Sequence, residues 1–370
     1  MKAIQGAKLR SKRGRRAIHQ LTAGFAASDA ISNEAQVLRA LFRSWGYESE
    51  IYSEPRCIAP MLRKEARDAA QLAASAGPDD LAILHLSIGS MVNDLFASLP
   101  CRRAIVYHNM TPAEHFRGIN ESIAGNLAWG RKQVHALADA ASVVMAVSRY
   151  NAAQLEAEGY GPVHILPLLL DFKRIRTRPD RSTQRTLDDG KANILFVGRC
   201  VPNKRIEDIL SAFYYFQKFI KPDSRLLLVG SHTGLEKYLV LLETMAHDLE
   251  LDQVLFMGSV SQEVLSACYK TADLFLCMSE HEGFCIPLIE SMTHDVPVLA
   301  YAAAAVPETL DGAGVLFREK RWDLIAEMMG SLLRNPGLRQ AVLMKQQQRL
   351  ARYEHLNLEH ELRDCLAPLL

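Results

Sequence analysis

The feature that most constrains this chain is an alternation of short apolar, β-branched runs with longer stretches whose apolar residues recur every three or four positions. Such alternation is typical of parallel β-sheets covered by helices, because each strand reaches its parallel neighbour through a helical crossover. The second half carries five clear runs, at 193–198, 225–230, 254–258, 273–278 and 296–301. The first half carries four weaker runs, near 17–22, 82–86, 103–107 and 143–147. A helix is expected over 33–45, ending at Gly46, and the chain is predicted to be an α/β protein.

The length predicts two domains, since 370 residues exceed the ~100–150 that one core usually organises. Hydrophobic residues at 49% and charged residues at 23% are typical of globular proteins and exclude disordered or collagen-like chains. Residues 172–190 lose apolar periodicity and fill with Arg, Asp, Thr and Gly, as a linker does. We therefore predict an N-terminal domain over 1–171, a linker over 172–190 and a C-terminal domain over 191–350. Residues 351–370 are expected to form a helix that packs back on the N-terminal domain.

Charge and cysteine content restrict the partners and the compartment. Lys and Arg number 43 against 42 Asp and Glu, so the net charge of +1 gives no reason to expect nucleic acid as a partner. Seven scattered cysteines without a CxxC pair suggest neither a disulfide framework nor a zinc ribbon, and favour the reducing cytoplasm. The first sixteen residues are basic without any acid. They are either a solvated leader or a peripheral contact with the anionic inner face of a membrane.

Glycines and cations follow the expected strands of the second half. In parallel α/β sheets ligands bind outside the carboxyl ends of the strands, so these residues are candidates for a binding site. Gly198 and Gly230 end two apolar runs and would let the backbone approach a ligand closely. Arg199 and Lys204 flank the start of the next expected helix, where a fork-shaped donor and a point charge can neutralise a diphosphate.

The segment from Glu282 to Met292 adds two carboxylates to these cations. Pro287 suits the first turn of a helix, so residues 283–285 are predicted to form a loop whose N–H groups face the ligand. Glu290 then lies about one turn into the helix, and Glu282 lies just ahead of it. Two carboxylates in these places can reach hydroxyl groups at opposite ends of one ligand, with a diphosphate between them. A sugar nucleotide has this layout.

This segment resembles the E-x7-E motif of the retaining glycosyltransferases of family 4 (glycosyl transferases group 1), which have the GT-B fold of two facing Rossmann-like domains. The stretches 'FVGRCVPNKRIEDILSAF', 'LLLVGSHTGLEKY' and 'VPETLDGAGVLF' match as well, so the resemblance covers about 191–350. It extends more loosely into the first 170 residues through 'VYHNMTP' and 'AVSRYNAAQLEAEGY'. It implies transfer of a hexosyl group from a nucleotide-diphosphate sugar, either GDP-mannose or a UDP-hexose, to a saccharide or lipid-linked saccharide. The usual setting is cell-surface polysaccharide synthesis.

The resemblance also implies roles for individual residues. The implied catalytic residues are Glu282, His108, Arg199 and Lys204. The implied donor-binding residues are Gly198, Arg199, Lys204, Gly230, Val260, Glu282, Gly283, Phe284, Cys285 and Glu290. Arg199 and Lys204 would hold the diphosphate, Glu282 the sugar hydroxyls and Glu290 the ribose. His108 would reach across the cleft to the transferred sugar.

The acceptor side is less defined in the sequence. Many family members have a glycine pair in the loop after the first strand, whereas this chain offers only Gly24 there. Ser28, Asp29, Asn33 and, after a later strand, Asn109 are the acceptor-side candidates. Capping of the following helix by Asp or Asn is the alternative interpretation of that loop.

No Asp-x-Asp pair occurs, so we predict neither a metal nor another cofactor. Two alternatives to a transferase remain open at this level. One is a nucleotide-sugar epimerase of the same fold, and the other is a non-catalytic scaffold in a polysaccharide assembly complex.

Overall fold

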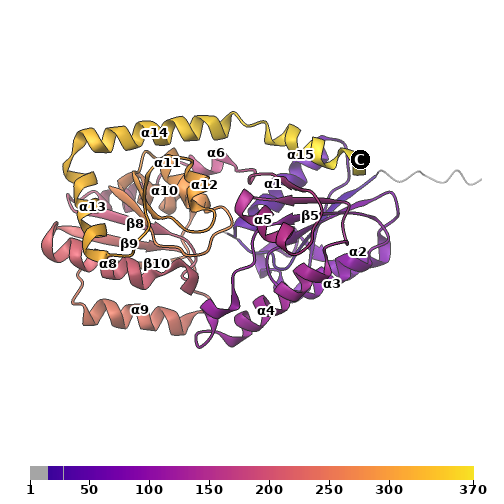
Figure 1. Ribbon diagram of the computed structural model, residues 1–370, viewed down its shortest axis with the longest axis horizontal. Coiled ribbons are helices and arrows are strands. Elements are labelled where there is room, and N and C mark those ends of the chain that lie inside the picture. The colour runs from indigo at the N-terminus through magenta and orange to yellow at the C-terminus, as the bar shows by residue number, and fades with distance from the viewer. Residues whose placement is uncertain (1–15, 28) are drawn as a thin grey trace, which may run out of the picture.

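The computed structural model describes residues 16–27 and 29–370, so the basic residues of 1–15 and the acceptor-side candidate Ser28 lie outside the described residues. Two parallel β-sheets, each covered by helices, lie side by side (Figure 1). The first sheet has seven strands in the order β3-β2-β1-β4-β5-β6-β7, and the second has six in the order β10-β9-β8-β11-β12-β13. The predicted α/β fold class is confirmed.

The first sheet has buried central strands and more exposed edge strands. Its strands are β1 (Ile18–Thr22), β2 (Ile51–Ser53), β3 (Arg67–Asp68), β4 (Leu81–Leu86), β5 (Arg102–Tyr107), β6 (Val143–Ala146) and β7 (Val163–Ile165). Its helices are α1 (Ala30–Ser44), α2 (Ala69–Ser75), α3 (Met91–Ser98), α4 (Glu121–Ala136) and α5 (Arg149–Ala157), with short 3-10 turns at Pro55–Cys57, Pro60–Leu62 and Ala113–Phe116. The four predicted runs correspond to β1, β4, β5 and β6. The sequence analysis missed β2, β3 and β7, because strands of two or three residues are too short to show a period.

The second sheet follows the predicted runs closely. Its strands are β8 (Ala192–Val197), β9 (Ser224–Val229), β10 (Val254–Gly258), β11 (Leu274–Cys277), β12 (Val298–Tyr301) and β13 (Val315–Phe317). Its helices are α8 (Ile206–Phe219), α9 (Glu236–Asp248), α10 (Gln262–Thr271), α11 (Ile286–Thr293), α12 (Val306–Leu310) and α13 (Trp322–Arg334), with a 3-10 turn at Pro202–Lys204. The edge strand β13, of three residues, was not predicted.

The segment between the sheets is more ordered than a flexible linker. It contains α6 (Phe172–Ile175) and α7 (Arg181–Leu187), and the carboxylate of Asp180 caps α7 by accepting from the Thr183 N–H at 2.7 Å. The Asp180 N–H donates to the Glu263 carbonyl at 2.9 Å, which attaches α7 to the second domain. Short capped helices of this kind carry too few apolar residues for their period to be read in a sequence.

The end of the chain returns to the first domain. Helix α14 (Pro336–Glu354) runs along one side of the molecule, and α15 (Leu358–Leu366) with the turn Ala367–Leu369 lies beside the first sheet (Figure 1). The Trp45 indole donates to Glu359 at 2.9 Å, and the Arg102 guanidinium donates to the Leu369 carbonyl at 2.9 Å. The C-terminal segment therefore joins the two domains. No helix in 16–27 or 29–370 is both long and apolar enough to span a membrane.

The attachment of α15 gives a test of the fold. Leu362 on α15 is fully buried in a cluster with Leu81 and Val143 of the first domain. Leu362→Ala is expected to lower the free energy of unfolding by about 2–5 kcal/mol, because a buried cavity is left behind. Urea denaturation followed by circular dichroism measures the loss. Leu356→Ala is the matched control, since Leu356 is 38% exposed and its truncation should change stability by about 0.5 kcal/mol or less. Equal, small losses in both variants would contradict the docking.

Candidate functional site

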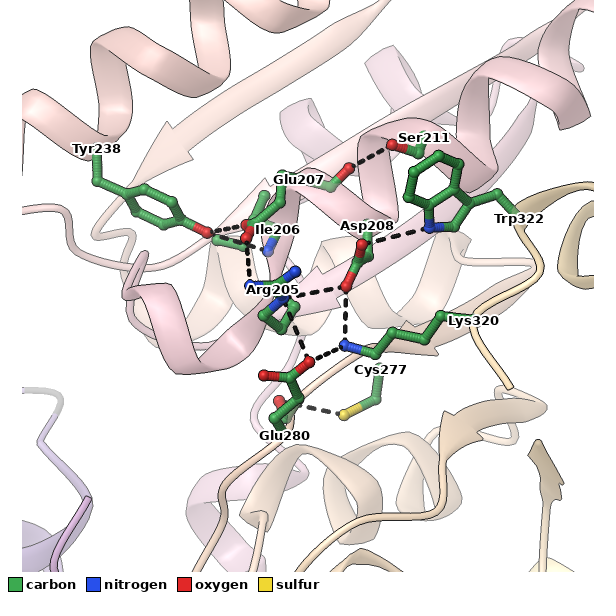
Figure 2. Close-up of polar contacts among 11 residues, drawn as sticks. Arg205, Ile206, Glu207, Asp208, Ser211, Tyr238, Cys277, Glu280, Lys320 and Trp322 are labelled. Atoms are coloured by element: carbon green, nitrogen blue, oxygen red, sulfur yellow. Dashed lines mark hydrogen bonds and ion pairs between the residues drawn. The ribbon is translucent and has the colours of Figure 1, made fainter. Parts of the chain in front are cut away.

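Four charged side chains join the start of α8 to the loop that follows β11. Arg205, in the left-handed conformation with φ 54°, lies 3.2 Å from Asp208 and 3.4 Å from Glu280. The Lys320 ammonium lies 2.8 Å from Asp208 and 2.7 Å from Glu280. Figure 2 shows both carboxylates turned toward these two cations. Each carboxylate is thus shared by two positive charges. These contacts fix the start of α8 against the loop that follows β11.

Asn203, which precedes Lys204 in the chain, also binds the loop that follows β11. Its side-chain amide donates to the His281 carbonyl at 2.9 Å, and its own carbonyl accepts from the Glu280 N–H at 2.9 Å. Lys204 and Glu282 are therefore held side by side, and the Lys204 ammonium is paired with the Glu282 carboxylate. Burial acts to lower the pKa of Lys204, but the Glu282 carboxylate and the thiols of Cys285 and Cys277 together raise it. The predicted cation and the predicted acid thus come together as one charged pair.

The loop after Glu282 contacts the first domain directly. A Cβ on Gly283 would lie 2.1 Å from the His108 carbonyl oxygen and 2.9 Å from the Asn109 Cβ. Any side chain at Gly283 would therefore push the two domains apart. Asn109 has φ 115°, and both polar atoms of its buried side chain have no hydrogen-bond partner. Unsatisfied buried amides of this kind suit a site that receives polar groups from a ligand.

Helix α11 places the second predicted acid. Cys285 precedes it in the left-handed conformation with φ 73°, and Pro287 lies in the first turn as expected. The Glu290 carboxylate accepts a hydrogen bond of 2.7 Å from the Tyr269 hydroxyl, and burial raises the pKa of Glu290. The carbonyl of Phe284 accepts from the Thr309 hydroxyl, which fixes the loop ahead of the helix.

The predicted glycines form the rim of the second sheet. A Cβ on Gly230 would lie 1.9 Å from the Gly198 carbonyl, so the loops after β8 and β9 touch. A small pocket at this edge is lined by both glycines together with His232 and Gly258. Val260, half-buried, follows β10 at the same edge. Arg199 lies in the loop after β8, and its exposed side chain makes no ion pair with any described residue.

His108 does not have the orientation that a role at the transferred sugar suggests. Its Nε2 lies 2.9 Å from His85 Nδ1 and 3.5 Å from Glu34 Oε2, so the tip of the ring points into its own domain. Burial, and then the neighbouring His85, lower the pKa of His108 well below its usual value. The sequence analysis missed Glu34 and His85. The only signal was a histidine near the carboxyl end of an otherwise apolar run at 82–86.

Asp29 and Asn33 make contacts within the protein. The Asp29 carboxylate accepts from the Ser32 N–H at 2.9 Å and caps α1, as the alternative interpretation of that loop states. The Asn33 side-chain carbonyl accepts from the Arg174 guanidinium at 2.5 Å. Arg174 belongs to α6, between the two sheets, so this contact lies at the domain junction.

The residues that position the charged pair were also missed. Glu280 lies in the polar segment after β11, where the only signal was its position two residues before Glu282. Lys320 is separated from it by 40 residues and carried no signal at all, because an isolated lysine after an edge strand is ordinary surface chemistry.

Comparisons with known proteins agree with this geometry. Residues 177–351 match the family described as glycosyl transferases group 1. The carboxyl-terminal half of the chain is thus similar to the glycosyl transferases group 1 family. The resemblance inferred from the sequence motifs is thereby confirmed.

Curated relatives of this chain include mannosyltransferases. A GDP-mannose-dependent alpha-(1-6)-phosphatidylinositol monomannoside mannosyltransferase of Mycolicibacterium smegmatis is 30% identical over 56% of this chain and 56% of its own length. The O-antigen chain mannosyltransferase B of Escherichia coli is 29% identical over 33% of this chain and 32% of its own length. The chain thus spans about half the length, or less, of these relatives.

Solved structures match almost the whole chain. Anabaena HepE, in complex with UDP and glucose, has a TM-score of 0.73 at 14% identity and covers 95% of this chain and 100% of its own. Sucrose-phosphate synthase of Thermosynechococcus elongatus has a TM-score of 0.74 at 17% identity and covers 96% of this chain and 99% of its own. At such identities the likeness concerns the fold, and the predicted GT-B architecture is confirmed.

The buried imidazole beside Glu282 gives a pH prediction. Burial, and then His115, lower the pKa of His281 to about 4, and its buried Nδ1 has no hydrogen-bond partner. In the unfolded chain a histidine titrates near its ordinary value of about 6.5. The unfolded state therefore binds the extra proton first, and stability falls as the pH drops from about 6.5 to 4, by up to about 3 kcal/mol from this group.

His281→Gln removes this titration, so its unfolding free energy should depend less on pH between 6.5 and 4 than that of the wild type. Denaturation curves at several pH values measure the difference. His164→Gln is the control, because His164 is exposed on β7. A His281→Gln profile parallel to the wild-type profile would contradict the assignment.

Proposed function

We propose that this protein is a retaining glycosyltransferase that moves a hexosyl group from a nucleotide-diphosphate sugar to a saccharide or lipid-linked saccharide. The observation that carries the proposal is the contact of Lys204 with Glu282 at the carboxyl edge of the second sheet, beside the junction with the first domain. In a GT-B protein this edge faces the cleft, where a sugar nucleotide would bind.

The charged pair is suited to exchange one partner for a ligand. A donor diphosphate would compete with Glu282 for the Lys204 ammonium, because it offers more negative charge and more acceptor oxygens. Glu282 would then be free to accept hydrogen bonds from sugar hydroxyls. Arg199, exposed and without an ionic partner among the described residues, is available to the same diphosphate. Glu290 would receive the ribose.

We propose GDP-mannose as the first donor to test. Two curated relatives from Mycolicibacterium smegmatis are GDP-mannose-dependent mannosyltransferases, which supports this choice. UDP-hexoses are the second choice, since structural neighbours bind UDP or UDP-glucose. The half-buried Val260, after β10, would line the base.

Catalysis would come from stabilising charge on the leaving diphosphate. Negative charge grows there as the glycosidic bond breaks, so Lys204 and Arg199 would bind the transition state more strongly than the ground state. Attack by the acceptor on the same face would retain the anomeric configuration without a covalent nucleophile. The two cations would supply the positive charge that a metal supplies in other transferases, so we propose that donor binding needs no metal.

The acceptor would approach from the first domain, where Asn109 presents its unpartnered amide. A saccharide or lipid-linked saccharide of the cell surface is the proposed acceptor class, with the protein in the cytoplasm at the inner face of the membrane. The basic residues of 1–15 would add attraction to anionic lipid.

Removal of the predicted charges tests the mechanism. Lys204→Ala, Arg199→Ala and Glu282→Ala should each lower the rate of transfer by at least about 10²–10³, since each deletes a group that stabilises or positions the reacting centre. The measurement is transfer of labelled mannose from GDP-mannose to cell-envelope extract. Lys218→Ala, which removes an exposed ammonium from the end of α8, is the control and should retain wild-type activity. Wild-type kinetics in all three variants, with circular dichroism unchanged, would end the proposal.

A thermal-shift screen identifies the donor. A ligand at one hundred times its Kd stabilises the folded protein by about 2.7 kcal/mol, so GDP-mannose should raise the melting temperature while ADP- and dTDP-sugars should not. Lys204→Ala should abolish the shift and Lys218→Ala should keep it. A rise in melting temperature with UDP-sugars alone would identify a UDP-sugar, and not GDP-mannose, as the donor. Epimerised product formed without acceptor would favour the epimerase, and no shift with any nucleotide sugar would favour the scaffold.

A further inference from the structure

Three metal-ligating side chains from different elements converge in the first domain. Glu34 comes from α1, His85 from β4, and His108 from the loop after β5. His85 Nδ1 lies 2.9 Å from His108 Nε2, His108 Nε2 lies 3.5 Å from Glu34 Oε2, and His85 Nδ1 lies 3.9 Å from Glu34 Oε2. The three atoms form a triangle with one possible ligand atom at each corner.

The size of this triangle fits a tetrahedral metal ion. Nitrogen and oxygen ligands bound to Zn²⁺ at about 2.0–2.1 Å in tetrahedral geometry lie about 3.3–3.4 Å from one another. The three observed separations, from 2.9 to 3.9 Å, bracket that value. We propose that Glu34, His85 and His108 bind a divalent transition metal ion, with Zn²⁺ favoured because imidazole and carboxylate are ligands that it accepts readily.

A neighbouring glutamine fixes the ligand form of His85. The Gln20 side chain donates its N–H to the Ala35 carbonyl at 2.9 Å, so its carbonyl oxygen faces His85 Nε2, also at 2.9 Å. His85 Nε2 must therefore carry the proton, and the lone pair of Nδ1 points to the triangle. Metal-binding histidines are commonly oriented by such a second hydrogen bond.

A hydrogen-bonded cluster without a metal leaves one oxygen of Glu34 without a partner. The two imidazoles can share one proton, but the buried Glu34 Oε2 has no hydrogen-bond partner, and the described chain offers Glu34 no Lys or Arg. A buried carboxyl oxygen without a partner costs free energy, and a bound cation would remove that cost.

Two buried polar groups without hydrogen-bond partners are neighbours of the proposed ligands, one in the sheet and one in the chain. Three protein ligands leave one tetrahedral position for water or a hydroxyl group. Thr22, the register partner of His85 on β1, has a buried hydroxyl without a hydrogen-bond partner, as does the amide of Asn109 next to His108.

We do not propose a metal at the second cluster of possible ligand side chains. Cys277, Glu282 and Cys285 also bring potential ligand atoms together. The Lys204 ammonium already pairs with Glu282, so its positive charge would oppose a metal ion there.

Cobalt(II) binding tests the site. The full-length protein is stripped with a chelator, dialysed and titrated with Co²⁺, whose visible absorption reports tetrahedral ligation, and Zn²⁺ is then added as competitor. We expect one Co²⁺ per chain, displaced by Zn²⁺. Glu34→Gln, which keeps the shape of the side chain, and His85→Asn should each weaken binding by at least about tenfold. His164→Ala, which removes an exposed histidine from β7, should bind as the wild type does.

Absence of stoichiometric Co²⁺ binding by the wild-type protein would overturn the proposal. So would unchanged affinity in both Glu34→Gln and His85→Asn, with circular dichroism confirming that they fold. Because the readout is metal binding, it is independent of the proposed transfer reaction, and either can fail without the other.

Discussion

The candidate site depends on the sharing of two carboxylates by two cations at the base of the second domain. Asp208 and Glu280 each lie within 3.4 Å of both Arg205 and Lys320, so the start of α8 and the loop after β11 cannot separate without exposing unpaired charge. Loss of one member of such a partly buried group is costly, because the others keep their desolvation penalty without compensation. The indole of Trp322 adds a hydrogen bond of 3.3 Å to Asp208, which brings the start of α13 into the same unit (Figure 2).

This rigidity matters because the pair of Lys204 and Glu282 lies directly beside the network. Lys204 precedes Arg205, and Glu282 follows Glu280 by two residues, so both inherit their positions from the network. A ligand that displaces Glu282 from Lys204 would meet a fixed cation and would not have to order a mobile one. Preorganised charge of this kind is what stabilises a transition state without reorganisation at the moment of reaction.

The two domains meet through backbone contacts as well as side chains. Gly283 fits against His108 only because it has no side chain, and the Glu308 carboxylate accepts from the Arg149 N–H at 2.7 Å at the start of α5. A third contact joins the Asn120 amide to the Gly234 carbonyl at 2.6 Å. The loops of the second domain therefore touch the first domain, and α14 with α15 joins the two domains elsewhere on the molecule (Figure 1).

The sequence alone determined the fold class and singled out the cations and acids of the candidate site. Its long buried strands have a period that depends on local geometry, and the candidate cations and acids are each marked by the strand end or helix start beside them. Tertiary structure alone decided the rest. Lys320 meets Glu280 across 40 residues, the three-residue strands exist only by pairing with longer neighbours, and the tip of His108 is directed to Glu34 and His85 by the order of β1, β4 and β5. These contacts join residues that are distant in sequence, and no local pattern encodes which distant side chain will lie opposite.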